Sequence, residues 1–315
     1  MKNKQNTQSI LMIEPVSFGF NEETANDNKF QSNDLSIDSK SIQRKALDQF
    51  TNMVEKLRKH GISVYVVKDT LEPYTPDSIF PNNWVSFHSN GAVAIYPMYA
   101  PNRREERRED ILDYLEEQGF QINEITDYSQ AEEEDVFLEG TGSMVLDRKN
   151  NIAYAAVSER TNEDLFIEYC EDFEFTPVVF HATQKIEGIE YPVYHTNVMM
   201  SVADNFAIIC FDVIKDLKER KFVSDFLHTS QKEVIAITEE QMNHFAGNVL
   251  EVEAEDGTKY LIMSNTAYHS LNRGQLDVIT KYCDILVVDI SVIETYGGGS
   301  ARCMMAEVFL EKDEI

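Results

Sequence analysis

The chain has 315 residues, of which 43% are hydrophobic, and a formal net charge of −27. A length of this order is compatible with about two domains, but α/β proteins of similar size often fold as one, and we expect a single domain over residues 1–315. So acidic a surface would repel a phosphate backbone, which excludes nucleic-acid binding but not a small substrate. The chain has no apolar run of about 18 residues and starts with a polar segment, so we expect a cytoplasmic protein with no membrane span.

Short apolar runs alternate with amphipathic segments along the whole chain. The runs predict strands at residues 10–13, 62–67, 85–87, 92–96, 143–147, 152–156, 198–202, 206–211, 260–264 and 285–289. The amphipathic segments predict helices at residues 42–60, 104–118, 162–173, 213–227, 238–245 and 270–281. This alternation is typical of an α/β protein.

Several predicted strands are joined by short turns, such as residues 147–151 and 203–205. Short links imply antiparallel neighbours, which a purely parallel sheet does not contain. The recurring unit is therefore strand, turn, strand, helix, and its repetition suggests small mixed modules around an axis. Residues 18–41 are rich in Asn, Asp, Ser, Glu and Thr without periodicity, and we expect a long loop that is mobile or caps the site.

The four cysteines are scattered, without a C-x-x-C pair or a histidine at zinc-ligand spacing. A disulfide scaffold and a metal site are therefore not expected, and free thiols suit a reducing compartment. Cys170, Cys210 and Cys283 lie in apolar or amphipathic surroundings and are expected in the core. Cys303 instead follows three successive glycines and Arg302. Glycines let a ligand approach the backbone, and a nearby cation would favour the thiolate, so Cys303 is the candidate nucleophile; a small core residue after a glycine-rich turn would show the same local pattern.

A cysteine nucleophile needs an acid–base partner and often an orienting carboxylate. His195 lies immediately before an apolar strand, a position that suits a site residue, although a half-buried structural histidine would fit there too. Glu139 ends an apolar run and is followed by glycines, which makes it the candidate carboxylate.

Taken in order, these segments resemble the guanidine-modifying (pentein) superfamily, which includes arginine deiminases, dimethylarginine hydrolases, amidinotransferases and succinylarginine dihydrolase. The resemblance covers residues 75–310 and rests on five motifs: the loop at 76–83, the arginine segments at 100–105 and 157–162, Glu-Gly-x-Gly with His-x-Asn, and the glycine-rich loop with its cysteine. The Phe-Pro-Asn-Asn-Trp motif at residues 80–84 resembles the citrulline-utilisation hydrolases most closely.

The resemblance implies a five-bladed α/β propeller of ββαβ-type modules that needs neither a metal nor an organic cofactor. It also implies that Cys303 attacks the central carbon of the substrate, that His195 protonates the leaving amine and activates water, and that Glu139 holds the imidazole. The remaining implied contacts are to the substrate: Arg103 and Arg160 would clamp its carboxylate, and the other binding residues would be Asp77, Asn82, Asn83, Asn197, Gly298 and Gly299.

Deiminases usually carry an acidic residue where Asn83 stands, and arginine deiminases have His-x-Asp where this chain has Asn197. Burying a cationic guanidinium without its counter-charge would cost several kcal/mol, whereas a neutral ureido group suits asparagine. We therefore expect hydrolysis of citrulline, or an N-substituted citrulline, to ornithine, carbon dioxide and ammonia. Asp77 keeps arginine open as the substrate, by deimination or double hydrolysis.

The sequence also leaves room for an amidinotransferase, a non-catalytic amino-acid-binding regulator, a papain-like peptidase and an acidic interaction module. In a papain-like enzyme the cysteine precedes the histidine, whereas Cys303 is nearly terminal. The expected partner is a small amino-acid substrate, with neither nucleic acid nor membrane, and a homo-oligomer is left open.

Overall fold

The strands of the computed structural model, which describes residues 4–25, 27–32, 38–186 and 188–313, repeat one arrangement. Within these residues they form five three-stranded sheets and one separate hairpin, β9 (Thr183–Ile186) with β10 (Ile189–Pro192). In every three-stranded sheet, the first strand is antiparallel to the middle strand, and the middle strand is parallel to the third. The predicted strand–turn–strand–helix unit is thus present, with a third strand after the helix.

The first sheet joins the two ends of the chain, because β17 (Ala306–Val308) pairs with β1 (Ser9–Glu14), which pairs with β2 (Ser63–Lys68). The other four sheets are continuous in sequence. They are β3 (Val85–Phe87), β4 (Ala92–Ile95) and β5 (Glu124–Asp127); β6 (Met144–Asp147), β7 (Ile152–Ala156) and β8 (Thr176–Phe180); β11 (Met200–Val202), β12 (Phe206–Ile209) and β13 (Glu233–Ala236); and β14 (Leu250–Glu253), β15 (Lys259–Ser264) and β16 (Asp284–Val288).

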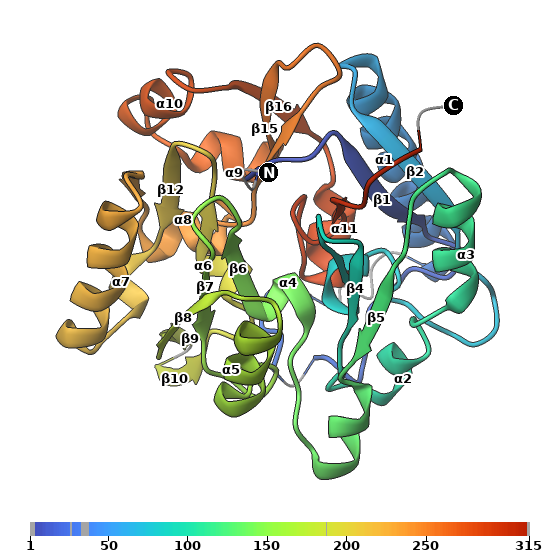
Figure 1. Cartoon of the computed structure of the whole chain (residues 1–315), viewed down its shortest axis with the longest axis horizontal. Coiled ribbons are helices and arrows are strands. Elements are labelled where there is room, and N and C mark those ends of the chain that lie inside the picture. The colour runs from blue at the N-terminus through green and yellow to red at the C-terminus, as the bar shows by residue number, and fades with distance from the viewer. Residues whose placement is uncertain (1–3, 26, 33–37, 187, 314–315) are drawn as a thin grey trace.

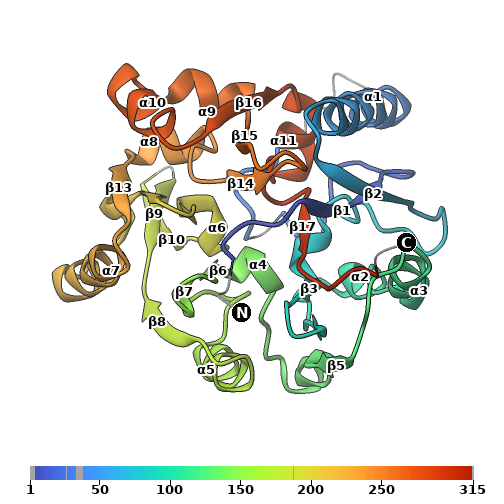
Figure 2. The ribbon, with the colours of Figure 1, turned by 45° about the horizontal axis from the view of Figure 1, so that its top comes forward.

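Helices link the middle strand of each sheet to the third strand and lie at the rim of the molecule, as Figure 2 shows for α1, α3, α5, α7 and α10. These links are α1 (Ser39–Lys59); α2 (Pro101–Arg104) with α3 (Glu109–Glu117); α5 (Glu163–Asp172); α7 (Leu217–Thr229); and α9 (Asn265–Ser270) with α10 (Arg273–Ile279). Shorter helices are α4 (Gly140–Ser143), α6 (Thr196–Met199), α8 (Glu239–Asn243) and α11 (Ser291–Gly297), and Figure 1 places α4 and α11 near the middle of the molecule. No helix among the described residues is long and apolar enough to cross a membrane.

Helix α1 illustrates how the sequence sets these elements. The Asp38 side chain accepts a hydrogen bond from the backbone N–H of Ser41 and so caps the first turn. The buried residues recur every three or four positions and form one apolar stripe: Ile42, Ala46, Phe50, Met53, Val54 and Leu57. Gly61, at φ +76°, then ends the helical segment in a conformation that glycine adopts without strain.

The ten predicted strands all occur, with ends that differ by at most a few residues. The predicted helix at residues 104–118 is divided into α2 and α3, and the one at 270–281 starts only at Arg273, as α10. The expected loop at 18–41 gives its last three residues to α1. Its segment 33–37 and residue 26 lie outside the described residues, while Phe18, Asn21, Thr24 and Asn28 are buried, so the described part of the loop is packed on the protein.

Candidate functional site

The predicted site residues share a topological position, just before the first strand of a module. Asn83 precedes β3, Glu139 precedes α4 and β6, and His195 precedes α6 and β11. Cys303 precedes β17 in the same way. Since the modules share one design, these equivalent positions converge, and each of the four residues is no more than 3% exposed.

Two neutral side-chain amides contact the Cys303 thiol. Its sulfur accepts from Asn197 Nδ2 at 3.4 Å and from Asn248 Nδ2 at 3.2 Å. Arg302, expected to favour the thiolate, instead donates to the carbonyl of Met305 at 2.8 Å and to the Glu307 carboxylate at 2.8 Å. The donors at the sulfur are therefore side-chain amides rather than the neighbouring guanidinium.

The glycine-rich loop before Cys303 is held from two sides. The buried Glu294 carboxylate accepts from Ser300 Oγ at 2.6 Å and from Thr266 Oγ1 at 2.7 Å. The Tyr194 hydroxyl donates to the carbonyl of Gly298 at 2.9 Å. Gly298 has φ +65°, and a Cβ on Gly299 would lie 2.9 Å from the Phe80 ring, so both positions favour glycine. Gly298 and Gly299, predicted to bind substrate, thus lie in the loop that leads to the thiol.

His195 and Glu139 form the predicted pair. His195 Nε2 lies 2.7 Å from Glu139 Oε2, and the other carboxylate oxygen accepts from the backbone N–H of Tyr99 at 2.9 Å. Burial opposes charge on Glu139, but Arg160 and His195 outweigh it and hold the pKa of this carboxyl well below its usual value. Burial lowers the pKa of His195 despite the opposing effect of Glu139. A neutral imidazole that donates from Nε2 to the carboxylate leaves Nδ1 as a base.

Gly142 lets the His195–Glu139 pair approach the loop at residues 76–83, which contains Asn82 and Asn83 and is called the asparagine loop below. A Cβ there would clash with Asn83 Nδ2 and would lie 2.9 Å from His195 Nδ1. Both polar groups therefore converge on the backbone of Gly142, and any side chain at this position would displace one of them.

The two predicted arginines are both buried and both paired within the chain. Arg103 makes a two-pronged contact with Glu106, Nε to Oε1 at 2.8 Å and Nη2 to Oε2 at 2.9 Å. Burial raises the pKa of Glu106 to about 7, although Arg103 opposes this shift. Arg160 contacts both oxygens of Asp27 and donates to Glu139 Oε2 at 3.3 Å. A substrate carboxylate would have to compete with Asp27 and Glu106, so the clamp stays a prediction.

Four buried polar atoms from the predicted binding residues have no hydrogen-bond partner within the described part of the chain. They are Asp77 Oδ1, Asn82 Oδ1, Asn83 Nδ2 and Asn197 Oδ1. Burying an unpaired polar group costs about 1–3 kcal/mol, and such groups usually meet a ligand or water. The orphan atoms thus mark where a polar ligand would bind.

The orientation of Asn83 is fixed by its other contact. Its Oδ1 accepts from Arg103 Nη1 at 2.9 Å. Since arginine can only donate, this atom must be the amide oxygen, and the orphan atom must be the N–H donor.

The loop after β1 covers this cluster. Asn21 Nδ2 donates to Asp77 Oδ2 at 2.7 Å, and Gln31 Nε2 donates to the carbonyl of Gly297 at 3.2 Å. Asp27 reaches Arg160 from the same loop. The sequence left open whether this loop is mobile or caps the site, and the geometry agrees with capping.

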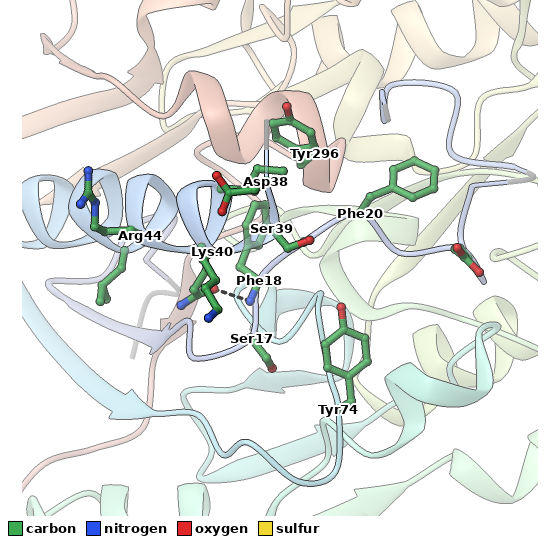
Figure 3. Close-up of a pocket in the computed structure, with 14 residues that line it drawn as sticks. Ser17, Phe18, Phe20, Asp38, Ser39, Lys40, Arg44, Tyr74 and Tyr296 are labelled. Atoms are coloured by element: carbon green, nitrogen blue, oxygen red, sulfur yellow. Dashed lines mark hydrogen bonds between the residues drawn. The ribbon is translucent and has the colours of Figure 1, made fainter. Parts of the chain in front are cut away.

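Two cavities adjoin the loop. A cavity of about 850 Å³ opens between the first turn of α1 and the side chain of Tyr74 (Figure 3), but none of the predicted site residues lines it. A smaller one of about 300 Å³ is lined by Asp27, Tyr99 and Tyr194, next to the Arg160–Glu139–His195 chain. We place the site next to the contacting side chains Arg160, Glu139 and His195, because the orphan polar atoms and the thiol belong to the same group of predicted site residues. The larger cavity is lined mostly by residues of the loop and of α1.

The other three cysteines are buried away from this cluster, and burial raises the pKa of each, to about 12 for Cys170 and about 11 for Cys210. No group of three or more His, Cys, Asp or Glu residues suited to a metal ion occurs among the residues described. The arrangement provides a thiol, an imidazole base and an oriented set of amide and carboxylate groups, which suits covalent attack on a planar carbon.

Asn248 is the site residue that sequence reasoning missed. It is fully buried, and its amide contacts the nucleophile itself. Its position just before β14 is the one that other site residues occupy in their modules, but the strand at 250–253 was not predicted.

Comparison with known proteins identifies the family. A family model described as N,N dimethylarginine dimethylhydrolase, eukaryotic, matches residues 14–310. No curated protein sequence matches the chain.

Among solved structures, 70 chains match. The apo structure of ArgZ, an arginine dihydrolase from the ornithine–ammonia cycle in Cyanobacteria, has a TM-score of 0.73 and 17% identity; the match covers 95% of this chain but 40% of ArgZ. The present chain therefore spans less than half the length of that protein. The N-terminal domain of ArgZ with bound substrate gives a TM-score of 0.70 at 17% identity, covering 95% and 97% of the two chains.

A dimethylarginine dimethylaminohydrolase variant in adduct with S-methyl-L-thiocitrulline matches with a TM-score of 0.63 at 16% identity, covering 96% and 99%. At such identities the likeness to solved structures shows the fold, which is that of the pentein enzymes and agrees with the expected α/β class. Members of the N,N dimethylarginine dimethylhydrolase family hydrolyse guanidino C–N bonds. The family model spans nearly all of the chain, and the protein therefore belongs to this family of the pentein superfamily.

Proposed function

We propose that this chain is a cysteine-dependent hydrolase that cleaves the ureido group of citrulline, or of an N-substituted citrulline, to ornithine, carbon dioxide and ammonia. The observation that carries the proposal is the amide of Asn83, whose N–H donor is unpaired, buried and fixed in orientation by Arg103. A ureido group has one carbonyl oxygen that can accept from this donor. A guanidinium has no acceptor, so the same N–H would face a cation.

The remaining orphan atoms fit the rest of a ureido group. Asp77 Oδ1 and Asn197 Oδ1 are acceptors, and the two ureido nitrogens carry N–H donors. Burial raises the pKa of Asp77, with Arg103 opposing the shift. A neutral substrate next to this carboxyl does not require a full counter-charge.

In the proposed reaction, Cys303 Sγ forms a bond to the ureido carbon, and His195 Nδ1 takes the thiol proton and passes it to the leaving nitrogen. The bond between the ureido carbon and the side-chain nitrogen breaks, ornithine leaves as the amine, and a carbamoyl thioester remains on the sulfur. His195 then takes a proton from water, whose oxygen attacks the thioester carbon and releases the thiolate. The carbamate formed breaks down so that citrulline and one water yield ornithine, carbon dioxide and ammonia.

Arg160 is the better placed of the two arginines to bind the carboxylate of the substrate, because its partner Asp27 belongs to the covering loop. Arg103 is held by Glu106, its neighbour in the chain, and orients Asn83. We propose that Gly298 and Gly299 allow the backbone to approach the substrate. Asn82, whose Oδ1 is unpaired, would be a further polar contact of the substrate.

Hydrolysis of arginine to ornithine in two steps is the second candidate. Two observations favour it: the free acceptor Asp77 Oδ1, which could receive a guanidinium N–H, and the likeness to ArgZ, an arginine dihydrolase. In such a reaction citrulline would be the intermediate, and the Asn83 donor would serve the second step.

The test is to incubate the purified full chain separately with L-citrulline, L-arginine and dimethylarginine and to quantify ammonia and amino-acid products, with Cys303→Ser as the control. We expect ornithine from citrulline and none with the variant. Ornithine with transient citrulline from arginine would favour the dihydrolase. Citrulline as the sole product of arginine or dimethylarginine would contradict the ureido assignment.

We also propose that the five modules surround one axis as a five-bladed propeller and that residues 1–315 form a single domain. The shared strand order of the five sheets and the pairing of β17 with β1 support this arrangement.

A further inference from the structure

The two amides at the Cys303 sulfur differ in how firmly their orientation is set. Asn248 Oδ1 accepts from the backbone N–H of Arg302 at 3.1 Å, and its Nδ2 donates to the carbonyl of Asn197 at 3.1 Å. A backbone N–H can only donate and a carbonyl can only accept, so rotating this amide by half a turn would break both contacts. The second N–H of Asn248 Nδ2 is therefore committed to the sulfur, at 3.2 Å.

Asn197 is not fixed in this way. Its Nδ2 lies 3.4 Å from the sulfur, but its Oδ1 has no partner among the described residues, so the contact with the sulfur is the one that holds this amide. The Asn197 side chain is free to contact the substrate, whereas the Asn248 side chain is held by the backbone groups of Arg302 and Asn197.

The arginines that could favour a thiolate are engaged elsewhere. The Arg302 guanidinium donates to the Met305 carbonyl and the Glu307 carboxylate. The Arg103 guanidinium donates to Glu106 and to Asn83. An N–H donor stabilises a sulfur anion more than a neutral thiol, because hydrogen bonds to ionised acceptors are about twice as strong as neutral ones.

We infer that Asn248 is a further catalytic residue, a fixed N–H donor that stabilises the Cys303 thiolate and aims it at the substrate carbon. The inference rests on the proposed function only in taking Cys303 as the nucleophile. It also deepens that function. A cationic guanidinium in the site would itself favour a neighbouring thiolate, but a neutral ureido group cannot, so the protein must supply the stabilisation.

The test is a pH titration of the thiolate in the full chain, without substrate. The ultraviolet absorbance of the thiolate is followed in the wild type and in each variant, and the trace of the matching Cys303→Ser protein is subtracted to remove tyrosines and the other cysteines. Asn248→Ala removes the donor. Asn248→Asp keeps the shape and the oxygen that accepts from the Arg302 N–H, but replaces the donor by a carboxylate oxygen. Asn243→Asp is the matched control, because it adds the same charge at an exposed position five residues earlier.

We expect the titration midpoint to move to higher pH by about one unit in Asn248→Ala and by roughly two units in Asn248→Asp, from the usual strength of a hydrogen bond to a charged group. Asn243→Asp should stay at the wild-type midpoint, and the acid limb of kcat/KM should move with the thiolate. An unchanged midpoint in a folded Asn248→Asp protein would overturn the inference, even if activity were lost, since that result would mean a purely structural role.

Two further results keep the inference separate from the proposed function. If Asn248→Ala fails to unfold cooperatively, Asn248→Leu carries the test, because leucine has nearly the shape of asparagine and neither an N–H donor nor a charge that would itself repel the thiolate. If the wild type turns over neither citrulline nor arginine, the substrate proposal fails, but the substrate-free titration still confirms or refutes the donor role.

Discussion

Asp27 holds Arg160 in a two-pronged ion pair, although the two residues are 133 positions apart in sequence. The Asp27 Oδ1 atom lies 2.7 Å from Arg160 Nη2, and the second oxygen contacts Nε. A third nitrogen of the same guanidinium, Nη1, donates to Glu139. The loop that covers the site therefore places a carboxylate on the arginine that we propose to bind the substrate carboxylate.

The first prediction concerns this competition. In Asn or Ala variants of Asp27 the substrate carboxylate no longer displaces a carboxylate of the chain. Because charge-assisted hydrogen bonds of this kind contribute about 1.5–3 kcal/mol, KM for citrulline should fall about tenfold in Asp27→Asn while kcat changes little. Steady-state kinetics with Asp38→Asn, a change at the exposed cap of α1, gives the control. A rise in KM would instead mean that Asp27 binds the amino group of the substrate.

The second prediction addresses the choice between ureido and guanidino substrates. Asn83→Asp keeps an oxygen for Arg103 but replaces the donor that faces the site with an acceptor. Citrulline hydrolysis should fall about a hundredfold in kcat/KM, because the ureido oxygen would face a carboxylate. Binding of arginine should strengthen at the same time. The ratio of kcat/KM for the two substrates, measured side by side, checks this; an unchanged ratio would rule out Asn83 as the ureido donor.

The third prediction uses the close approach at Gly142. The added methyl group of Gly142→Ala would clash with Asn83 Nδ2 and would lie 2.9 Å from the His195 ring. We expect kcat to fall at least tenfold, because displacing either group by about 1 Å misaligns the reaction. Gly274→Ala on α10, whose Cβ would lie 3.3 Å from Asn272 Oδ1, is the control and should retain wild-type kcat. Wild-type activity in Gly142→Ala would show that Asn83 and His195 do not act together.

The sequence was informative where local chemistry and position coincide. Glu139 and His195 each lie at the boundary of an apolar run, and the structure brings the two side chains to 2.7 Å. The strand Leu250–Glu253 contains two glutamates and is therefore not an apolar run, so it was not predicted. Asn248 was missed because the prediction of site residues relied on their position before a predicted strand. The third strand β5 was missed for a related reason, since most of its residues are exposed.

The partners of the arginines could not be predicted from sequence. The Arg103–Glu106 pair spans a single turn, but nothing local shows that both residues are buried, because burial depends on how α2 packs on the asparagine loop. The Arg160–Asp27 pair depends on the path of a loop without periodicity. Both contacts depend on tertiary structure. Only the folded chain therefore shows that the two arginines predicted to bind the substrate carboxylate already bind carboxylates of the protein.

The fourth prediction concerns acid stability. The pKa of Glu139 is held well below its ordinary value of 4.5, mainly by Arg160 and His195 against the effect of burial. A group with a depressed folded-state pKa contributes stability above its unfolded pKa and loses this contribution as pH falls. In Glu139→Gln the free energy of unfolding should be about 3 kcal/mol lower at neutral pH, since the variant leaves Arg160 without one carboxylate partner. The deficit should shrink as pH falls below 4.5.

Glu106→Gln supplies a control of opposite sign. Burial raises the pKa of Glu106 to about 7, so its contribution is present below its ordinary value of 4.5 and is lost as pH rises towards 7. Relative to the wild type, Glu106→Gln should therefore gain stability between these two pH values, where the Glu139→Gln deficit stays constant. Urea unfolding of both variants over the whole range measures the two slopes. Parallel curves for the two variants would show that the carboxylates of the site do not ionise separately, and that the Arg103 and Arg160 pairs titrate as one network.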